Sequence, residues 1–377
     1  MAIFATMLKI GILGGGQLGR MLLQAAANYP VETHILENDP ACPSAHLCHQ
    51  FTKGSILNFE DVYNFGKGLD VLTIEIENVN IEALEKLEQE GKKIVPNTHV
   101  LKTIRNKILQ KEFYQKNEIP TADFLVTNSK AELLKHTSFI PAVHKIGEGG
   151  YDGKGVQLIK NDADMQLGFD APAVLEKMID VKEEVALIVA CDGNGAMAFY
   201  PPVQMHFDPV LNLLDYQICP APLSENSNKK LREIAKKLVE EFRSPGLFAI
   251  EFLIDKSGDI FVNETAPRVH NSGHHTIEAH YSSQFDMLWR ILIGAPLGNP
   301  NAISPSVLIN IIGTQNGEPS YSSLSQILSI PNVFVHLYGK KQVKPGRKMG
   351  HINLLGSQKE QLLEKVQTIK VFLPDLC

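Results

Sequence analysis

The stretch LKIGILGGGQLGR, residues Leu8–Arg20, joins an apolar run to a helical pattern through a glycine-rich turn. Gly14, Gly16 and Gly19 fit the G-x-G-x-x-G fingerprint of dinucleotide-binding folds. Glycines here allow a tight turn and leave the amides at the helix N-terminus open to an anion. Glu37 ends the next apolar run, where an acidic residue would meet a ribose hydroxyl. Three interpretations stay open: a nucleotide site, a site for another ligand, and a turn that needs glycine for close packing.

Strand and helix patterns alternate outward from this stretch. Short apolar runs predict strands at Leu8–Leu13, Val31–Leu36, Val71–Ile76 and Lys93–Val95. Amphipathic spacing predicts helices at Gln17–Asn28, Ile81–Glu90 and Thr98–Lys116. Strands that alternate with helices indicate a doubly wound parallel sheet, an α/β fold resembling the Rossmann architecture.

The remainder of the chain reads as α+β. Short strands surround a second glycine loop, and further strands are expected at Ala173–Glu176 and Val185–Ala190. We expect a long amphipathic helix at Asn226–Phe242 and a hairpin formed by Leu247–Ile254 and Ile260–Asn263. From about Ser304 the pattern predicts short strands and one helix, Gln358–Ile369.

The composition limits the class of protein. The chain has 377 residues, of which 44% are hydrophobic and 21% charged, enough for two or three domains. A formal net charge of -6 argues against nonspecific nucleic-acid binding. No apolar run is long enough to span a bilayer. Five cysteines in a chain of this length form no disulfide framework, so we expect a soluble, reducing, cytoplasmic setting.

The second glycine loop, GEGGYDGKG, covers Gly147–Gly155. It is not a Walker A loop, because Gly155 stands where Ser or Thr should follow the lysine. Such a loop is mobile and exposes amides, which suits covering phosphates, and Lys145 lies just upstream. The alternative, a flexible hairpin, explains less well why Tyr, Asp and Lys stand between the glycines.

Two carboxylates stand in otherwise apolar strands, Glu251 in FAIEFLI and Glu264 in FVNETAPR. A two-residue turn at Ser257-Gly258 would place them opposite each other. A divalent cation would relieve their repulsion, and Mg²⁺ commonly bridges one or two carboxylates to substrate phosphates. Asn263 offers a third oxygen if the chain bends there. The alternative is a pair of solvated glutamates.

Two later stretches are candidates for anion binding. RVHNSGHHT contains several histidines without the regular spacing of a zinc site, and its Arg268 is the strongest candidate for contact with an anionic substrate. YGKKQVKPGRKMGH places lysines and an arginine around a Pro345-Gly346 turn. Such a run either binds a phosphate monoester or forms a solvated face.

Together these features resemble the ATP-grasp superfamily. The stretches GGGQLGRM, TIEIENV, GGYDGKG, NETAPRVHNSGHHT and KPGRKMGHIN are similar, in order and over nearly the whole chain, to the N5-carboxyaminoimidazole ribonucleotide synthetase family. The resemblance implies a Rossmann-like domain (1–108), a lid subdomain with the glycine loop (109–178), a catalytic ATP-grasp subdomain (179–303) and a small strand-rich C-terminal subdomain (304–377). It also implies a homodimer.

The resemblance carries the family's ligand contacts onto positions of this sequence. ATP contacts would fall on Lys107, Lys145, Gly150, Tyr151, Asp152, Gly153, Lys154, Gly155, Glu176, Lys177, Met178, Ile179, Glu184, His206, Asn263 and Glu264. Mg²⁺, expected as two ions, would be held by Glu251, Glu264 and Asn263. Aminoimidazole ribonucleotide would meet Glu77, Tyr151, Asp152, Arg268, His270, Asn271 and Ser272, its phosphate Lys340 and Arg347, with Gln17 and Leu18 as further neighbours. Lys107 and Lys344 replace arginines of many relatives, so the charge is kept and the planar fork is lost.

The implied reaction is the ATP-dependent carboxylation of aminoimidazole ribonucleotide with bicarbonate, through carboxyphosphate. Lys145, Asp152 and Arg268 are the expected catalytic residues. Two other enzymes are alternatives. A formate-dependent glycinamide ribonucleotide transformylase would share the ATP site but differ at RVHNSGHH, and an NAD-dependent dehydrogenase would leave the second loop and the carboxylate pair unexplained. A non-catalytic nucleotide sensor would have little need for Asp152 and Arg268.

Overall fold

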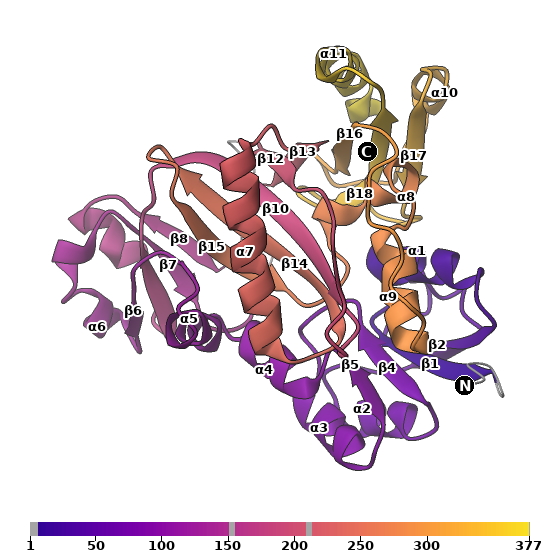
Figure 1. Cartoon of the computed structure of the whole chain (residues 1–377), viewed down its shortest axis with the longest axis horizontal. Coiled ribbons are helices and arrows are strands. Elements are labelled where there is room, and N and C mark those ends of the chain that lie inside the picture. Colours follow the sequence, from indigo (N-terminus) through magenta and orange to yellow (C-terminus); the bar gives the residue numbers. More distant parts are fainter. Residues whose placement is uncertain (1–6, 151–154, 209–212, 377) are drawn as a thin grey trace.

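Three β-sheets organise the chain in the computed structural model, which describes residues 7–150, 155–208 and 213–376 (Figure 1). The first sheet is parallel, in the order β3-β2-β1-β4-β5. Its strands are β1 (Leu8–Leu13), β2 (Val31–Glu37), β3 (Gln50–Lys53), β4 (Val71–Ile74) and β5 (Lys93–Val95). The helices between them are α1 (Gln17–Ala26), α2 (Phe59–Gly66) and α3 (Ile81–Gln89). The predicted parallel α/β sheet is confirmed.

The helix predicted over Thr98–Lys116 is two helices, α4 (Thr98–Arg105) and α5 (Lys107–Lys116). Asn106 interrupts them with extended backbone angles, φ -103° and ψ 116°. Its side chain accepts hydrogen bonds from the amides of Ile108 and Leu109, so it caps the second helix. The apolar spacing continues across this break, which is why periodicity alone predicted one helix.

A small antiparallel sheet follows, in the order β6-β9-β7-β8. It consists of β6 (Phe124–Thr127), β7 (Ala142–Ile146), β8 (Val156–Ile159) and β9 (Ala173–Lys177), with α6 (Lys130–Leu133) beside it. The glycine loop joins β7 to β8, and the Ile146 amide donates to the Gly155 carbonyl at 2.9 Å. Lys145 therefore lies on a strand, as predicted.

The largest sheet has nine strands, in the order β15-β14-β10-β12-β13-β16-β18-β17, with β11 beside β10. Its strands are β10 (Val181–Cys191), β11 (Met197–Phe199), β12 (Val203–Phe207), β13 (Leu214–Cys219), β14 (Gly246–Asp255), β15 (Ile260–Ala266), β16 (Ser306–Ile312), β17 (Val333–Leu337) and β18 (Lys348–Leu355). Antiparallel pairing of β13 with β16 joins the C-terminal strands to this sheet. The predicted strand-rich C-terminal region is thus present as an extension of the large sheet.

Helices cover this sheet on the side shown in Figure 1, where α7 (Glu225–Phe242) lies across β10 and β14. Ser224 caps α7 through the Ser227 amide, and one face of the helix packs into the core through Leu231, Ala235, Leu238, Val239 and Phe242. The remaining helices are α8 (Thr276–Ala279), α9 (Gln284–Ile293), α10 (Leu324–Leu328) and α11 (Lys359–Lys370). α9 packs against α1, so the large sheet and the first domain share a core.

In the hairpin of β14 and β15 the predicted two-residue turn is wrong, but the predicted pairing of Glu251 with Glu264 is confirmed. The Asp255 amide donates to the Asp259 carbonyl, and Gly258 adopts φ +87°, so the turn has three residues and not two. That turn alone would shift the register by one. A bulge at Asn263 shifts it back, and Glu251 lies directly opposite Glu264, as predicted.

Candidate active site

Lysines and glutamates from four elements meet where the small sheet faces the β14–β15 hairpin. The Glu176 carboxylate on β9 pairs with Lys111 of α5 at 2.9 Å and with Lys145 of β7 at 3.1 Å. Lys107, at the start of α5, donates to Glu264 on β15. One turn of helix separates Lys107 from Lys111, so both ammonium groups lie on the same face of α5.

Burial and charge set the protonation of this cluster. Burial lowers the pKa of Lys111 to about 8, although Glu176 opposes the shift. Burial would raise the pKa of Glu176, but the Lys145 and Lys111 ammonium groups outweigh it and lower that pKa. For Lys107, burial works against the charge, yet the adjacent Glu264 raises its pKa. The cluster therefore presents cations held close to a buried anion, an arrangement suited to a polyphosphate.

The opposed glutamates form an acidic group beside these lysines. Glu184 on β10 is diagonal to Glu251 across the β10–β14 pair, so three carboxylates share one face. Burial, Glu264 and Glu184 raise the pKa of Glu251 to about 8, whereas Lys107 chiefly lowers that of Glu264 to about 2. Burial also raises the pKa of Glu184.

The Asn263 bulge serves the same site. Because the bulge breaks strand alternation, the Asn263 side chain is brought to the lysine side, and Lys145 donates to its Oδ1 at 2.9 Å. The oxygens of Glu251, Glu264 and Asn263 are hard donors of the kind that Mg²⁺ prefers. Carboxylate repulsion of the strength seen at Glu251 fits a site completed by a divalent cation.

A second group of contacts lies toward the first domain. Arg268, just after β15, pairs its Nε with Glu77 Oε1 at 2.9 Å. Glu75, two residues earlier, instead accepts hydrogen bonds from the amides of Gly16 and Gly19. Glu77 thus faces Arg268, as the predicted substrate contact requires, and Glu75 faces the first glycine loop.

The loop after Arg268 is held by side-chain hydrogen bonds. His270 Nδ1 lies 2.9 Å from Ser272 Oγ, and His270 Nε2 lies 3.8 Å from Glu251 Oε1. Asn271 and Asn310 of β16 exchange amide hydrogen bonds of 3.0 and 2.9 Å. Of the predicted substrate residues, His270 is therefore brought next to Glu251, Ser272 contacts His270, and Asn271 is braced by a C-terminal strand.

The basic stretch around Pro345-Gly346 reaches the same region through β18. Lys340 Nζ donates to the Lys348 carbonyl at 2.7 Å, and Arg347 Nη1 to the Gln342 carbonyl at 2.8 Å. Lys348 lies close enough to Glu251 to lower the pKa of that carboxyl. One residue of the stretch, Lys348, therefore interacts electrostatically with the acidic group, whereas Lys340 and Arg347 donate to carbonyls of the stretch itself.

Part of the predicted site lies outside the described residues, namely Tyr151, Asp152, Gly153 and Lys154. Gly150 and Gly155 flank them, and a Cβ on Gly155 would meet Gly150 Cα at 3.0 Å. The loop is anchored to α5, because the Lys107 amide donates to the Gly147 carbonyl at 2.7 Å.

Several predicted residues stand apart from the charged cluster. Lys177 directs its ammonium to the Phe139 and Ile140 carbonyls, and Met178 and Ile179 follow it on the segment between β9 and β10. His206 stacks on Tyr216 with ring centroids 4.4 Å apart. Gln17 begins α1, and Leu18 belongs to the hydrophobic core, so its side chain packs and does not line an open site.

Three residues of the site were not predicted from sequence: Lys111, Glu75 and Asn310. Lys111 stands on the buried face of α5 with Gln110 and Tyr114. A lysine is rarely buried unless it is paired, so its place on this face could have indicated a functional charge. Glu75 and Asn310 depend on partners 56 and 39 residues away. No local pattern reveals such partners.

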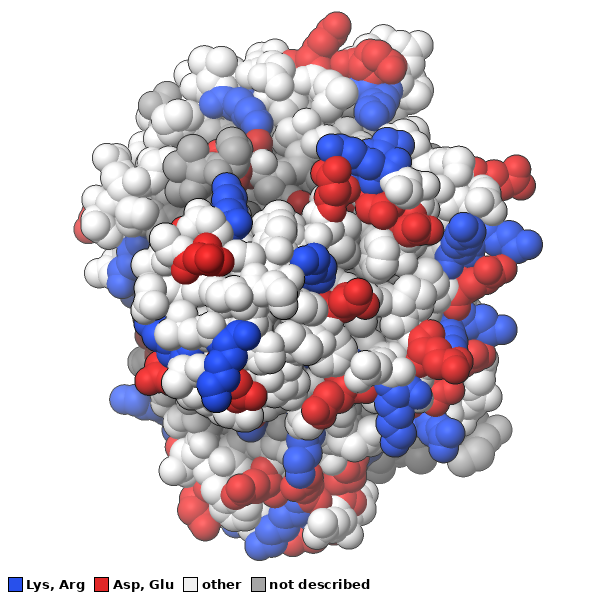
Figure 2. Space-filling model, turned by 90° about the vertical axis from the view of Figure 1, so that its left-hand side faces the viewer, with Lys and Arg blue, Asp and Glu red and all other residues white. Residues whose placement is uncertain are grey.

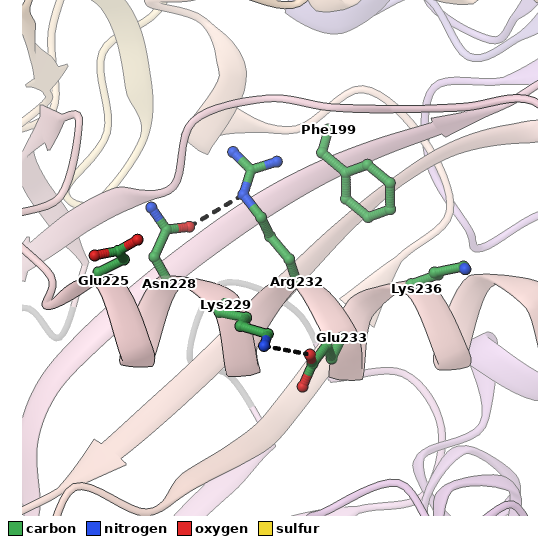
Figure 3. Close-up of a pocket in the computed structure, with 7 residues that line it drawn as sticks. All are labelled: Phe199, Glu225, Asn228, Lys229, Arg232, Glu233 and Lys236. Atoms are coloured by element: carbon green, nitrogen blue, oxygen red, sulfur yellow. Dashed lines mark hydrogen bonds and ion pairs between the residues drawn. The ribbon is translucent and has the colours of Figure 1, made fainter.

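One hollow on the surface lies away from this cluster. A cavity of about 500 Å³ runs along α7, where Arg232 donates to Asn228 at 3.1 Å and Phe199 lines the same hollow (Figure 3). Figure 2 shows acidic and basic side chains interspersed on the face beside the small sheet, without a broad basic patch on that face. None of the described helices has the length and apolar character needed to cross a membrane.

Comparison with known proteins agrees with this geometry. Family models match residues 7–105 (ribonucleotide synthetase preATP-grasp domain), 112–285 (ATP-grasp domain) and 306–365 (phosphoribosylaminoimidazole carboxylase C-terminal domain). The N5-carboxyaminoimidazole ribonucleotide synthase of Aquifex aeolicus is 36% identical over 97% of this chain and 97% of its own length. This chain belongs to the N5-carboxyaminoimidazole ribonucleotide synthetase family.

Solved structures of the family share the whole fold. The N5-carboxyaminoimidazole ribonucleotide synthetase of Thermotoga maritima aligns with a TM-score of 0.90 at 36% identity, over 97% of this chain and 98% of that one. The Aspergillus clavatus synthase in complex with ADP and 5-aminoimidazole ribonucleotide aligns with a TM-score of 0.88 at 33% identity, over 97% and 98% of the two chains. The chloroplastic phosphoribosylaminoimidazole carboxylase of Vigna aconitifolia is 33% identical over 92% of this chain, which spans 64% of that longer protein. The predicted ATP-grasp fold and family are confirmed.

Proposed function

We propose that this chain uses ATP and bicarbonate to carboxylate the exocyclic amine of 5-aminoimidazole ribonucleotide, a step of purine biosynthesis. The products are N5-carboxyaminoimidazole ribonucleotide, ADP and phosphate. The observation that carries the proposal is the union of buried lysines, opposed carboxylates and the Arg268–Glu77 pair in one region. Relatives of the same fold bind ADP and the ribonucleotide together.

ATP is proposed to lie between the small sheet and the β14–β15 hairpin. Lys107 and Lys145 would contact its phosphates, and the loop Gly150–Gly155 would cover them. The adenine would meet the segment Glu176 to Ile179, with Glu184 and His206 as further contacts. In this arrangement Lys111 keeps Glu176 charged and fixed, so that Lys145 is aimed at the phosphates.

Glu251, Glu264 and Asn263 would hold Mg²⁺, proposed as two ions. Bound there, the metal would neutralise charge on the β- and γ-phosphates. The protein's part is to keep Glu251 and Glu264 opposed through the Asn263 bulge.

The ribonucleotide is proposed to lie between the first domain and the C-terminal strands. Its amine would meet Glu77, Tyr151 and Asp152, its ribose His270, Asn271 and Ser272, and its phosphate Lys340 and Arg347. Gln17 would border this site through its place at the start of α1. Leu18 would contribute only by packing beneath it.

The chemistry divides into two transfers. A bicarbonate oxygen attacks the γ-phosphorus, the bond to ADP breaks, and carboxyphosphate forms. The exocyclic nitrogen then bonds to the carboxyl carbon, the carbon–oxygen bond to phosphate breaks, and the amine loses a proton. Arg268 would hold bicarbonate and then carboxyphosphate, and Asp152 would accept or orient the proton of the amine. Closure of the loop would protect carboxyphosphate from water.

Three further proposals rest on the family. The domains would divide at residues 108, 178 and 303, the chain would form a homodimer, and the protein would work in the cytoplasm. Light scattering coupled to size exclusion tests the dimer: a mass near twice 41.7 kDa is expected, and a monomeric mass would contradict it.

A coupled ADP assay tests the reaction. ADP release should require both bicarbonate and aminoimidazole ribonucleotide, because carboxyphosphate can transfer its carboxyl group only when the amine is present. Glu264→Ala should abolish Mg²⁺-dependent turnover, whereas Glu233→Ala on the exposed face of α7 should not. ADP release indifferent to the ribonucleotide would refute the substrate assignment, and near-normal turnover of Glu264→Ala would refute the metal assignment.

A further inference from the structure

Three buried side chains with metal-binding atoms meet behind the substrate loop. Cys219 ends β13, and His275 and His280 flank α8 on either side. One donor atom from each residue lies within 4.8 Å of the other two, and none of the residues is more than 4% exposed. Among the described residues this is the one such group of cysteine, histidine and acidic side chains.

The histidines are oriented as metal ligands usually are. His280 Nδ1 lies 2.8 Å from the Pro300 carbonyl, so this nitrogen carries the ring proton and Nε2 is left with a lone pair. That Nε2 lies 3.8 Å from Cys219 Sγ, close to the separation of about 3.6 Å expected between a nitrogen and a sulfur on one tetrahedral zinc.

His275 is tethered at one end and unpaired at the other. The Ser272 carbonyl accepts a hydrogen bond from its ring, and Gln217 Nε2 lies 3.0 Å from its Nδ1. Its Nε2 is buried and has no hydrogen-bond partner in the described part of the chain. A buried ring nitrogen without a partner is costly, and a ligand is one way to satisfy it. Binding through Nε2 requires the ring proton to sit on Nδ1, so the Gln217 amide must turn to present its Oε1, which is buried without a partner among the described residues, to that nitrogen.

Burial keeps all three groups neutral. It raises the pKa of the Cys219 thiol to about 12 and lowers the pKa of both His275 and His280. Neutral imidazole is the form that binds metals, so only the thiol proton must be displaced.

We propose that Cys219, His275 and His280 bind one Zn²⁺ ion that is separate from the catalytic metal site. One sulfur and two imidazole nitrogens suit zinc and not Mg²⁺, which prefers oxygen. Binding releases the thiol proton to solvent and forms a sulfur–zinc bond and two nitrogen–zinc bonds, and water takes the fourth position. The ligand atoms must draw together by about 1 Å, within the reach of small side-chain rotations.

The consequence would be a brace for the substrate loop. His275 lies two residues after Asn271–Gly273, and Cys219 belongs to the strand that joins the two parts of the large sheet. A metal that links these residues would fix the loop from behind without touching the substrate.

The test is metal analysis of the full-length, untagged chain expressed with zinc and purified without chelator. Wild type and the matched control Cys191→Ser, another buried free cysteine, should retain about one zinc per chain. Cys219→Ser and His280→Gln should retain about a tenth of that or less. Cobalt substitution should give a near-ultraviolet thiolate-to-cobalt absorption band in wild type and Cys191→Ser, and none in Cys219→Ser.

Two results would overturn the site. One is wild-type protein that, after dialysis against zinc, holds no more metal than Cys219→Ser. The other is a cobalt spectrum unchanged by Cys219→Ser. Because metal content of the wild type is itself decisive, the test stands even if a variant folds poorly. Because neither measurement involves turnover, its outcome is independent of the proposed reaction.

Discussion

Glu176 shows how single residues make a charged site tolerable inside a protein. Its carboxylate faces Lys111 and Lys145, and both Lys111 and Glu176 are almost fully buried. Taking such charges out of water costs on the order of several kcal/mol per ion. Only close pairing with an opposite charge offsets that cost. The pairing therefore fixes Lys145 before any ligand arrives.

Removing that carboxylate should destabilise the ligand-free protein. We expect Glu176→Ala to lower the free energy of unfolding by about 3–5 kcal/mol, because two buried ammonium groups lose their counter-charge. Urea denaturation measures the change. The control is Glu233→Ala, whose exposed pair with Lys229 spans 4.0 Å and should contribute under about 0.5 kcal/mol. Equal changes in the two variants would contradict the role assigned to Glu176.

Because of the raised pKa of Glu251, we expect the free energy of unfolding of the metal-free protein to depend on pH. Its folded pKa of about 8 exceeds the ordinary value of 4.5, so the folded state holds this proton more tightly than the unfolded state. The contribution of Glu251 to stability should therefore fall as pH rises from about 5 to about 8. In a chelating buffer, Glu251→Gln should lose less stability than wild type over that range. Thermal unfolding at several pH values measures this, with the exposed Glu240→Gln as control; parallel curves for wild type and Glu251→Gln would disprove it.

At the scale of elements, the first glycine loop has the shape of a dinucleotide-binding turn, but a carboxylate of the protein itself takes the place of the ligand's phosphate. The Glu75 carboxylate occupies the amides of Gly16 and Gly19, which a pyrophosphate would otherwise engage. A Cβ on Gly14 would meet Glu75 Cγ at 2.5 Å, so the glycine is needed for this internal contact. The fingerprint therefore marks the fold of the loop and not an NAD site.

This reading predicts that Glu75 is a stabilising residue of the loop. Glu75→Ala should lower the free energy of unfolding by about 2–4 kcal/mol, since two amides lose their acceptor. Urea denaturation measures it, and Glu82→Ala, an exposed glutamate in the first turn of α3, is the control. Wild-type stability in Glu75→Ala would show that the hydrogen bonds from the Gly16 and Gly19 amides to Glu75 are dispensable.

The elements also show what sequence patterns can and cannot predict. β1 and β5 have the predicted bounds, because each is a short apolar run between polar or glycine residues. The break at Asn106 was missed because apolar spacing continues across it. The opposition of Glu251 and Glu264 was correct although the turn was wrong, because the Asn263 bulge compensates for it. Partners distant in sequence, such as Cys219 and His280, had no local signal.

At the scale of the molecule, the C-terminal strands are part of the large sheet. The Ile218–Val307 register pair lies within the β13–β16 junction, and Asn310 braces Asn271 across it. Sequence patterning predicted a strand-rich C-terminal region, but register between strands so far apart depends on the assembled core.

Truncation tests that continuity. A chain ending at residue 305 should be insoluble or lack cooperative unfolding, because β13 would become an uncovered edge and Ile218 would lose its packing partners. Circular dichroism during thermal unfolding, with the full-length chain as reference, measures this. A soluble fragment with a sharp transition would show that the C-terminal strands form an independent unit.

The single sheet that runs from β15 to β17 also sets the distance between two parts of the proposed site. Glu251 and Glu264 stand on its first two strands, and the Lys340–Arg347 turn joins its last two. Backbone hydrogen bonds between every neighbouring pair fix the span between these two ends, whereas the small sheet with the glycine loop is a separate sheet. The span between these two ends therefore does not depend on the small sheet. In the proposed reaction, the distance between the metal ligands Glu251 and Glu264 and the phosphate contacts Lys340 and Arg347 would therefore be a property of this one sheet.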